Sequence, residues 1–447
     1  MGSGSGVSRE ILRLAIPSLG AMVAQPLFLL TDAAMVGTLG TTAVAGLALA
    51  GTVVQTVVGV LIFLTYATTP LVSRRRGAGD EAGALAAGIN GVWIALVVGV
   101  VLAIGVGAAS TRLVSLFGAD ATVTAAAAEF LAISAVGIPA MLVTLAATGF
   151  LRGFGDARTP LAVAVVGFVA NAGLNALLIF AAGWGLAGSA WGSVIATYLM
   201  AAALLYPVIR RAHRAHSRLL PGRDSLIAVG HSASWLLLRT LSLRVSMVAY
   251  VAVATSLGTE ALAASHIVST IVGLLALILD ALEVPAQALV GESLGASDVP
   301  RTHAMARTIT RMAVATGFVV GVGLAASASV IPVLFTRDAA VATMITGALW
   351  VVAAALPLAG YVFAWDGILI GAGDSRYLAG AGVVNLLVAL PGFVVVFVNG
   401  NGLWGIIALQ IVWSVLYMGA RALTLGRRAR GDAWMRIGHD RMAATSA

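Results

Sequence analysis

Three polar side chains in otherwise apolar stretches of the N-terminal half have the types and spacing needed for ion exchange. Asp32 lies in PLFLLTDAAMVGTLG (26–40), and Asn171 and Asn175 lie in a later apolar stretch. An ionised carboxylate near a bilayer centre costs about 2.5–3.5 kcal/mol on insertion scales, so such positions are functional by default. The two amides, four residues apart, share one helix face. We expect the three to converge and Asp32 to bind and release a proton, because desolvation disfavours the charged form of a buried carboxyl group. The alternatives are a structural hydrogen bond for Asp32 and helix-to-helix adhesion for the amides.

The C-terminal half carries a different charged set in its apolar stretches, namely Arg239, Asp280, Glu283 and Asp366. A pairing of Arg239 with Asp280 or Asp366 would neutralise buried charge, and we favour such a structural latch. The alternative is a second proton or cation site. Glu283 could also simply reach the membrane interface.

Membrane-spanning helices must position these residues. The 447-residue chain is 60% hydrophobic and 10% charged, whereas a soluble domain is about 25% charged. Its long apolar runs are continuous, which favours helices over the alternating strands of a β-barrel. We predict twelve spans, at 10–37, 44–72, 84–110, 124–149, 159–181, 187–209, 226–257, 261–290, 304–332, 341–368, 377–398 and 402–424.

The distribution of the basic residues predicts the orientation of the chain in the membrane. All 26 are Arg; 22 lie in one alternating set of connections or at the termini, two (Arg112 and Arg337) lie on the other side, and two (Arg239 and Arg244) lie inside a span. The positive-inside rule places both termini in the cytoplasm. The basic connection at 210–223 then contacts anionic lipid, and we predict no nucleic-acid binding. The chain has no Cys and no Lys, which excludes disulfides, a Walker A loop and a Lys Schiff base.

The chain contains an internal repeat at an offset of 218 residues. LGTTAVA (39–45) aligns with LGTEALA (257–263), and GFLRGFGDAR (149–158) aligns with GILIGAGDSR (367–376). Each half holds six spans, so the halves enter the membrane in the same orientation. We predict an all-α polytopic membrane protein of two six-helix bundles related by pseudo-two-fold symmetry. Its expected parts are a flexible N-terminus (1–9), an N-terminal lobe (10–209), a basic linker (210–225), a C-terminal lobe (226–425) and a basic cytoplasmic tail (426–447).

The repeat also shows where the halves differ. Asp32, Asn171 and Asn175 align with Tyr250, Ala389 and Phe393, so the first half alone carries a carboxylate and two amides at these positions. The Gly-x-Gly-Asp-x-Arg segments recur in both halves, and we assign them to tight turns and helix capping.

The ordered set of motifs resembles the MATE (multidrug and toxic compound extrusion) transporters, in their DNA-damage-inducible F branch. The resemblance rests on PLFLLTDAAMVGTLG, GFLRGFGDARTP, NAGLN (171–175), LILDALEVPAQALVGESLGA (277–296) and WDGILIGAGDSR (365–376), and it covers essentially the whole chain. It implies the MATE fold, with twelve helices in two lobes around a central cleft. It also implies export of amphipathic, often cationic, small molecules against an ion gradient.

The resemblance implies roles for individual residues. Asp32 matches the proton or cation site of that branch, supported by Asn171 and Asn175. Some relatives carry Asp at the position of Asn175, and this departure argues against a two-carboxylate Na⁺ site. We therefore favour H⁺ as the coupling ion, with Na⁺ as the alternative. The candidate substrate-cleft residues are Gln25, Phe28, Met141, Ser193, Thr197 and Tyr361, for each of which ordinary helix packing is the alternative.

We expect no cofactor and no metal centre, a monomer in a bacterial plasma membrane, and no enzymatic activity. A flippase for lipid-linked precursors is one rival, although its cleft should hold several cations and only Arg239 and Arg244 lie inside a span. An intramembrane enzyme is disfavoured because no His-Glu-x-x-His motif and no Cys nucleophile occurs. A sensor without transport is disfavoured by the repeated twelve-span design.

Overall fold

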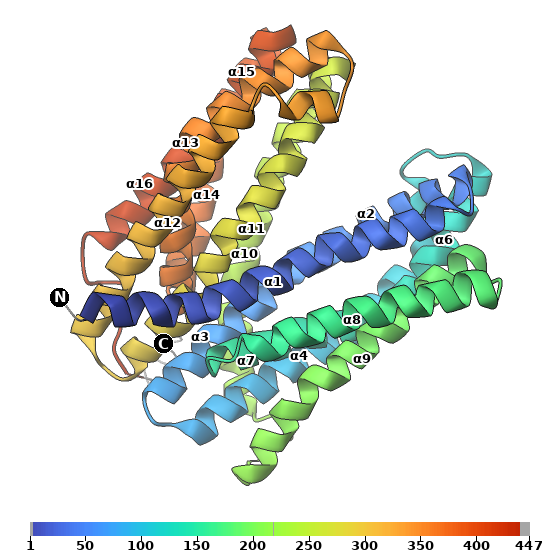
Figure 1. Cartoon of the computed structure of the whole chain (residues 1–447). Coiled ribbons are helices and arrows are strands. Elements are labelled where there is room, and N and C mark those ends of the chain that lie inside the picture. The colour runs from blue at the N-terminus through green and yellow to red at the C-terminus, as the bar shows by residue number, and fades with distance from the viewer. Residues whose placement is uncertain (1–2, 218, 439–447) are drawn as a thin grey trace. The chain divides into compact units, whose positions relative to one another are not determined.

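The computed structural model describes residues 3–217 and 219–438, and within these residues the regular structure is entirely helical. The first half contains α1 (Ser3–Gly37), α2 (Thr41–Leu61), α3 (Phe63–Gly77), α4 (Glu81–Ala108), α5 (Ser110–Ser115), α6 (Ala121–Val136), α7 (Ile138–Gly153), α8 (Arg158–Ala176), the π-helical turn η1 (Leu177–Ala181) and α9 (Gly185–Arg214) (Figure 1). The second half contains α10 (Arg223–Ser256), α11 (Thr259–Gly295), α12 (Val299–Ser327), η2 (Ile331–Leu334), α13 (Ala339–Gly371), α14 (Ser375–Asn399), α15 (Gly402–Ile411), η3 (Val412–Tyr417) and α16 (Met418–Ala429).

The twelve predicted spans are confirmed, with one geometric difference. Eleven helices or continuous helix runs in the described residues are long and apolar enough to cross a membrane, and α6 with α7 supplies a twelfth span that is bent by 46°. The bend falls at Gly137, which separates the two helices, and Pro139 lies in the first turn of α7. Proline has no backbone N–H to continue the preceding helix, which explains why the span predicted at 124–149 is not one straight helix.

The chain divides into two compact units, which we call the N-terminal unit (residues 16–233) and the C-terminal unit (residues 3–15 with 234–438). This division differs from the expected lobe boundaries at both ends of the first lobe. Residues 3–15 group with the second half, and the start of α10 groups with the first half. The predicted linker is also shorter than expected, because α9 continues to Arg214 and α10 begins at Arg223.

Backbone geometry repeats at the predicted offset of 218 residues. Gly40 and Gly258 precede the second helix of each half with φ of 106° and 104°. This left-handed conformation strongly favours glycine. Asp120 and Asp338 cap corresponding helices, each accepting from two backbone N–H groups. The hydrogen bonds that Asp120 accepts from the Thr122 hydroxyl and from backbone N–H groups lower the pKa of its carboxyl group.

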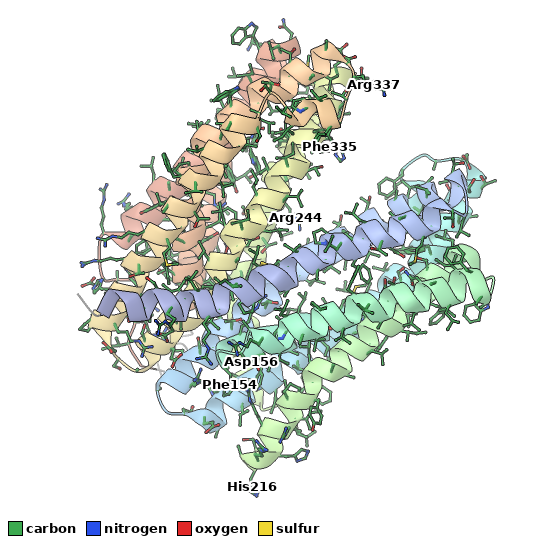
Figure 2. All side chains as sticks on the ribbon, viewed as in Figure 1. Phe154, Asp156, His216, Arg244, Phe335 and Arg337 are labelled. Atoms are coloured by element: carbon green, nitrogen blue, oxygen red, sulfur yellow. The ribbon has the colours of Figure 1, made fainter. Side chains whose placement is uncertain are left out.

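The Asp residues of the two Gly-x-Gly-Asp turns both bind the last helix of their own unit. Asp156 accepts from the Thr159 N–H at 3.0 Å and lies 3.9 Å from Arg211 on α9. The guanidinium of Arg211 also lies over the ring of Phe154, beside Asp156 in Figure 2. In the C-terminal unit, Asp374 accepts from Arg428 on α16 at 2.6 Å. The turns therefore hold the sixth span of each half against its neighbours, in addition to the predicted turn chemistry.

The outer faces of the helices suit a lipid environment. Large apolar side chains such as Val166, Val248 and Val319 are each 68% exposed, as expected where lipid tails replace water. Arg337, one of the few Arg residues outside the basic connections, lies at the end of the C-terminal unit where α13 begins, next to Phe335 (Figure 2).

Candidate functional site

Asp32 is buried in the N-terminal unit, on the last third of α1. The helix continues through Pro17 and Pro26 to Gly37, and the Asp32 side chain is only 4% exposed. Its Oδ1 atom accepts two hydrogen bonds, from Asn175 Nδ2 and from Ser189 Oγ, each at 2.6 Å. In the part of the chain that the structure describes, Asp32 has no ion-pair partner. The carboxyl group is therefore held by neutral donors alone.

The two amides of α8 continue this contact into a chain of hydrogen bonds. Asn171 and Asn175 are fully buried on one face of the helix. Asn175 Nδ2 lies 3.4 Å from Asn171 Oδ1, and Asn171 Nδ2 donates to Ser193 Oγ at 3.0 Å. The predicted convergence of Asp32 with both amides is thus confirmed. We call Asp32, Asn171, Asn175, Ser189 and Ser193 the Asp32 network.

Helix α9 supplies a part of the network that sequence reasoning missed. Ser189, Ser193 and Thr197 follow each other at intervals of four residues and so share a face. Only Ser193 and Thr197 are among the predicted residues, yet Ser189 is the one that contacts Asp32. The four-residue spacing was the signal that could have identified it.

A glycine on α9 makes room for the amide of Asn175. A Cβ atom at Gly192 would overlap Asn175 Oδ1 and would lie 3.1 Å from the Asn175 backbone nitrogen. Asn175 Oδ1 is itself buried without a hydrogen-bond partner. The close approach of α8 and α9 at this point therefore depends on the absence of a side chain.

The second half carries different side chains at the equivalent positions of the repeat. Tyr250, the repeat equivalent of Asp32, donates to Gln410 Oε1 at 3.0 Å, and Gln410 is the equivalent of Gly192. The equivalents of the two amides, Ala389 and Phe393, belong to the hydrophobic core of the C-terminal unit. The buried carboxyl group of this location is therefore specific to the first half.

The other predicted cleft residues do not hydrogen-bond to the carboxyl group of Asp32 in the part of the chain that the structure describes. Gln25 is exposed, whereas Phe28 and Met141 are half-buried, and none of the three hydrogen-bonds to the network in the described residues. Thr197 donates to the Ser193 backbone carbonyl at 2.7 Å. Tyr361 is half-buried in the C-terminal unit, with its ring centroid 6.4 Å from that of Trp365. Contact of these residues with substrate stays a prediction.

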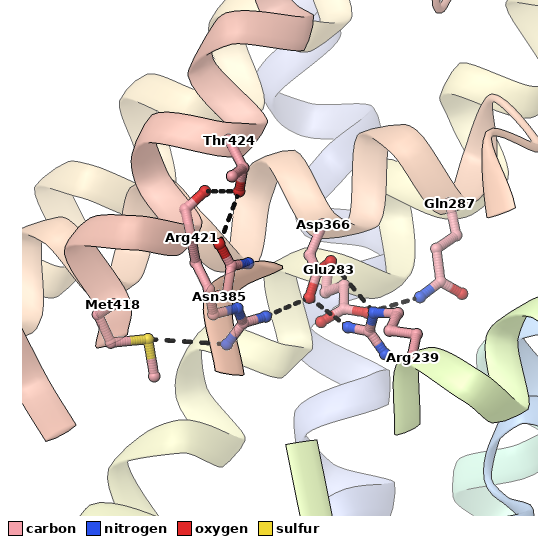
Figure 3. A network of polar contacts seen from close by, with 8 residues as sticks. All are labelled: Arg239, Glu283, Gln287, Asp366, Asn385, Met418, Arg421 and Thr424. Atoms are coloured by element: carbon pink, nitrogen blue, oxygen red, sulfur yellow. Dashed lines mark hydrogen bonds and ion pairs between the residues drawn. The ribbon is translucent and has the colours of Figure 1, made fainter. Parts of the chain in front are cut away.

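The charged residues of the C-terminal unit form a second buried network (Figure 3). Arg239 on α10 donates to Asp366 on α13 through Nε at 3.3 Å and through Nη2. The predicted pairing of Arg239 with Asp366 is thus present, with Arg239 6% and Asp366 3% exposed. Its role as a latch stays a prediction.

Arg421 is a further member of this network that the sequence did not reveal. It lies on α16 and donates through Nη2 to the same Asp366 oxygen that Arg239 contacts. It also lies 3.6 Å from the Met418 sulfur, and the adjacent Thr424 hydroxyl donates to Asn385 at 3.2 Å. From sequence alone, Arg421 belonged with the basic cytoplasmic end of the last span. The helix instead turns it inward, so Asp366 is shared between two guanidinium groups.

Glu283 and Asp280 complete the charged set. Glu283 is 4% exposed and accepts from Gln287, one helical turn further along α11, at 2.9 Å. A Cβ atom at Gly367 would lie 2.7 Å from the Glu283 side chain, so α11 and α13 are in close contact there. Asp280 is half-buried, one turn before Glu283. Glu283 therefore lies inside the unit and does not reach the surface.

In chemical terms, the Asp32 network can exchange one monovalent cation or proton at a carboxyl group. The described residues contain no group of three His, Cys, Asp or Glu side chains that could hold a metal ion. The Asp366 network, by contrast, is an ion pair whose carboxylate already has two cationic partners.

Comparisons with known proteins identify the family. The MatE family model matches residues 17–177 and 236–398. Protein DETOXIFICATION 44, chloroplastic, of Arabidopsis thaliana is 28% identical over 93% of this chain and 83% of its own length. DNA damage-inducible protein F of Escherichia coli is 26% identical over 95% of this chain and 94% of its own length.

Solved structures agree on the fold. The Vibrio cholerae MATE transporter VcmN in its bent form has a TM-score of 0.88 at 21% identity, covering 97% of this chain and 100% of that one. A structure of a MATE transporter in complex with MaD3S has a TM-score of 0.85 at 23% identity. The chain is a multi-pass membrane protein and belongs to the MATE family of multidrug and toxic compound efflux transporters.

Proposed function

We propose that this protein exports amphipathic, cationic small molecules in exchange for protons, and that Asp32 is the group where the two are coupled. The observation that carries the proposal is the environment of Asp32. It is 4% exposed in a membrane-spanning helix, its Oδ1 accepts from Asn175 and Ser189, and it has no ion-pair partner in the described residues.

This environment acts on the ionised state of Asp32 in two opposing ways. The ionised carboxylate gains two hydrogen bonds from neutral donors, each worth about 1.5–3 kcal/mol when the acceptor is charged. It lacks a cation, and an uncompensated charge in the membrane interior is costly. A proton removes the charge, and a cationic substrate in the same unit compensates it. Proton and substrate therefore compete for one negative charge, which is the thermodynamic requirement for exchange.

The bends available to α1 suggest how protonation could alter the helix. Pro17 and Pro26 lie within α1 ahead of Asp32 and each removes a backbone hydrogen bond. Protonated Asp32 fits an apolar bundle, whereas ionised Asp32 demands polar partners. We propose that the bend of α1 changes when Asp32 gains or loses a proton, and that this change acts as the gate.

The remaining parts of the proposal concern orientation and branch. The distribution of Arg residues favours a bacterial plasma membrane location with both termini in the cytoplasm. The protein is proposed to act as a monomer, and to belong to the DNA-damage-inducible F branch. A flippase for lipid-linked precursors is disfavoured, because its cleft should hold several cations. The guanidinium groups of Arg239 and Arg421 are both bound to Asp366, and Arg244 is a single half-buried Arg.

The test is proton release from purified protein on addition of ethidium, in weakly buffered, Na⁺-free detergent solution. Wild type is expected to release protons, Asp32→Asn to release none, and the exposed-carboxylate control Glu129→Gln to behave as wild type. Binding of ethidium is measured in parallel by fluorescence. If wild type binds the dye without releasing protons, and added Na⁺ alone weakens binding, the coupling ion is Na⁺ and the proton assignment is wrong.

A further inference from the structure

Arg244 lies at the centre of a membrane-spanning helix of the C-terminal unit and is labelled in Figure 2. The part of α10 that is apolar enough to cross a membrane runs from Ala233 to Ser256. Arg244 is therefore about 17 Å from either end of this span, at about 1.5 Å per residue. The hydrocarbon core of a typical bilayer extends about 15 Å to each side of its centre. An arginine side chain is too short to reach a lipid headgroup from that depth.

No carboxylate pairs with Arg244 in the part of the chain that the structure describes. Arg239 on the same helix is bound to Asp366. The acidic residues of the next helix, α11, lie at other depths. Counted along both helices from the short connection between Ser256 and Thr259, Glu260 lies about 16 Å nearer to the connection than Arg244, and Asp280 lies about 14 Å farther from it. The charge of Arg244 is therefore not compensated within its own unit.

Arg244 belongs to an exposed face of α10. Leu241, Val248 and Val251 lie on this face at intervals of three or four residues, and they are 43%, 68% and 53% exposed. Arg244 itself is half-buried. Ser246, on the opposite face of the helix, is fully buried, and its hydroxyl donates to the Ser242 carbonyl. The packed side of α10 therefore faces the unit, and Arg244 faces away from it.

The position of Arg244 indicates what its face of α10 meets. The apolar side chains of this face suit lipid tails, but a guanidinium group does not, because it stays charged at any physiological pH. Charged side chains within membrane spans almost always face the interior of the protein or a water-filled cavity. Since Arg244 does not face the interior of its unit, we infer that this face lines the path along which substrates cross the membrane.

The internal repeat shows that Arg244 is not part of the shared architecture. Its equivalent at the offset of 218 residues is Pro26 on α1. The first helix of the first half thus carries an acid, Asp32, and the first helix of the second half carries bases, of which Arg239 is paired with Asp366. The proposed function uses Asp32 and gives no role to Arg244.

We propose that Arg244 binds the carboxylate group of amphipathic substrates, so that the transporter accepts zwitterions that carry a carboxylate as well as a positive charge. This inference rests on the proposed function, since it concerns the class of substrate that is exported. The planar guanidinium offers two parallel N–H donors that match the two oxygens of a carboxylate. Leu241, Val248 and Val251 present an apolar surface beside it for the body of such a molecule.

The test compares two dyes that differ in one group. Tetramethylrhodamine with a free carboxylate is a zwitterion at neutral pH, and its methyl ester is a cation with the same ring system. Binding of each dye to the purified full chain in detergent is measured by fluorescence anisotropy, with empty micelles as the blank. Wild type is expected to bind both dyes. In Arg244→Gln the dissociation constant of the free acid should rise about tenfold or more, as for the loss of one hydrogen bond between charged groups, and that of the ester should not rise.

Two further variants and a control separate the charge of Arg244 from its packing. Arg244→Lys keeps the charge without the bidentate geometry, and it should retain part of the affinity for the free acid. Val248→Glu leaves Arg244 in place and adds a carboxylate one turn away on the same face, which should compete with the free acid and spare the ester. Arg337→Gln removes an exposed Arg of the same unit, just before α13, and should bind both dyes as wild type does.

The outcomes divide clearly. An equal loss of both dyes in Arg244→Gln would show a role in the fold alone, and unchanged binding of both would place Arg244 outside the path; either result overturns the inference. Failure of wild type to bind the free acid also overturns it, even if no variant folds. These results leave the role of Asp32 standing. Proton release on addition of ethidium that does not depend on Asp32 contradicts the proposed function instead, whatever the two dyes do.

Discussion

The sharing of Asp366 between two guanidinium groups leads to a prediction about stability. Asp366→Asn removes the carboxylate that Arg239 and Arg421 share, and the side chains of these two residues are only 8% and 10% exposed. Breaking a buried pair by removing one partner costs about 3–5 kcal/mol, because the remaining charge stays buried. Because Asp366 neutralises two buried cations, we expect Asp366→Asn to lower the free energy of unfolding by an amount at the upper end of that range, about 5 kcal/mol.

Arg421→Met is expected to lower the free energy of unfolding by less than Asp366→Asn does, because Asp366 keeps its contact with Arg239. Its cost should be near the value of a hydrogen bond to a charged group, about 1.5–3 kcal/mol. The double variant Asp366→Asn with Arg421→Met should lose less than the two single losses together, since it removes one of the two buried cations along with the carboxylate. A non-additive energy of about 0.5–3 kcal/mol is expected for residues in one network.

The exposed pair of Arg301 and Glu10 is the matched control. Its atoms are 2.9 Å apart, but its side chains are 41% and 38% exposed. Arg301→Met should therefore cost no more than about 1 kcal/mol. The free energies of unfolding can be compared by SDS titration in mixed micelles, followed by tryptophan fluorescence. If Asp366→Asn loses no more stability than Arg301→Met, burial does not govern this pair and the argument is refuted.

Two further predictions concern packing, each with a control in the same chain. Gly192→Ala should cost about 1–3 kcal/mol of stability by overpacking and abolish ethidium-evoked proton release, because the new Cβ overlaps the amide of Asn175. Gly173→Ala on α8, with nothing within 4 Å of its Cβ, should retain release, and equal behaviour of the two variants would contradict the packing argument. Trp434→Ala should cost about 3–5 kcal/mol, because Trp434 is 2% exposed and packs at 5.6 Å against Trp365. Trp404→Ala, at a residue that is 75% exposed, should change the unfolding free energy by about 0.5 kcal/mol or less, and a similar loss in both would show that Trp434 is not anchored as described.

Much of the fold could be predicted because apolar runs, Arg placement and the 218-residue repeat are properties of the chain itself. Asp32, Asn171 and Asn175 were identifiable because a polar residue in a membrane helix is unusual wherever its neighbours lie. Ser189 was not, since serine is common in such helices and only the approach of α9 to α1 shows its role. Arg421 was misleading for a related reason: an Arg near the cytoplasmic end of a span normally points to the interface, and its inward direction depends on the position of Asp366. The division of α1 between units likewise arises from tertiary contacts, whereas the bend at Gly137 follows from the local chemistry of Pro139.

The membership of residues 3–15 in the C-terminal unit bears on how the two repeats relate in evolution. Ile11 is completely buried and Glu10 pairs with Arg301, so this segment completes the fold of the second half. An ancestral single repeat would have obtained the corresponding segment from another copy, as in a domain-swapped dimer. Joining the two repeats in one chain would make such an exchange permanent. A fragment containing only the second repeat should therefore be unstable when expressed alone, and co-expression with the first repeat should rescue it.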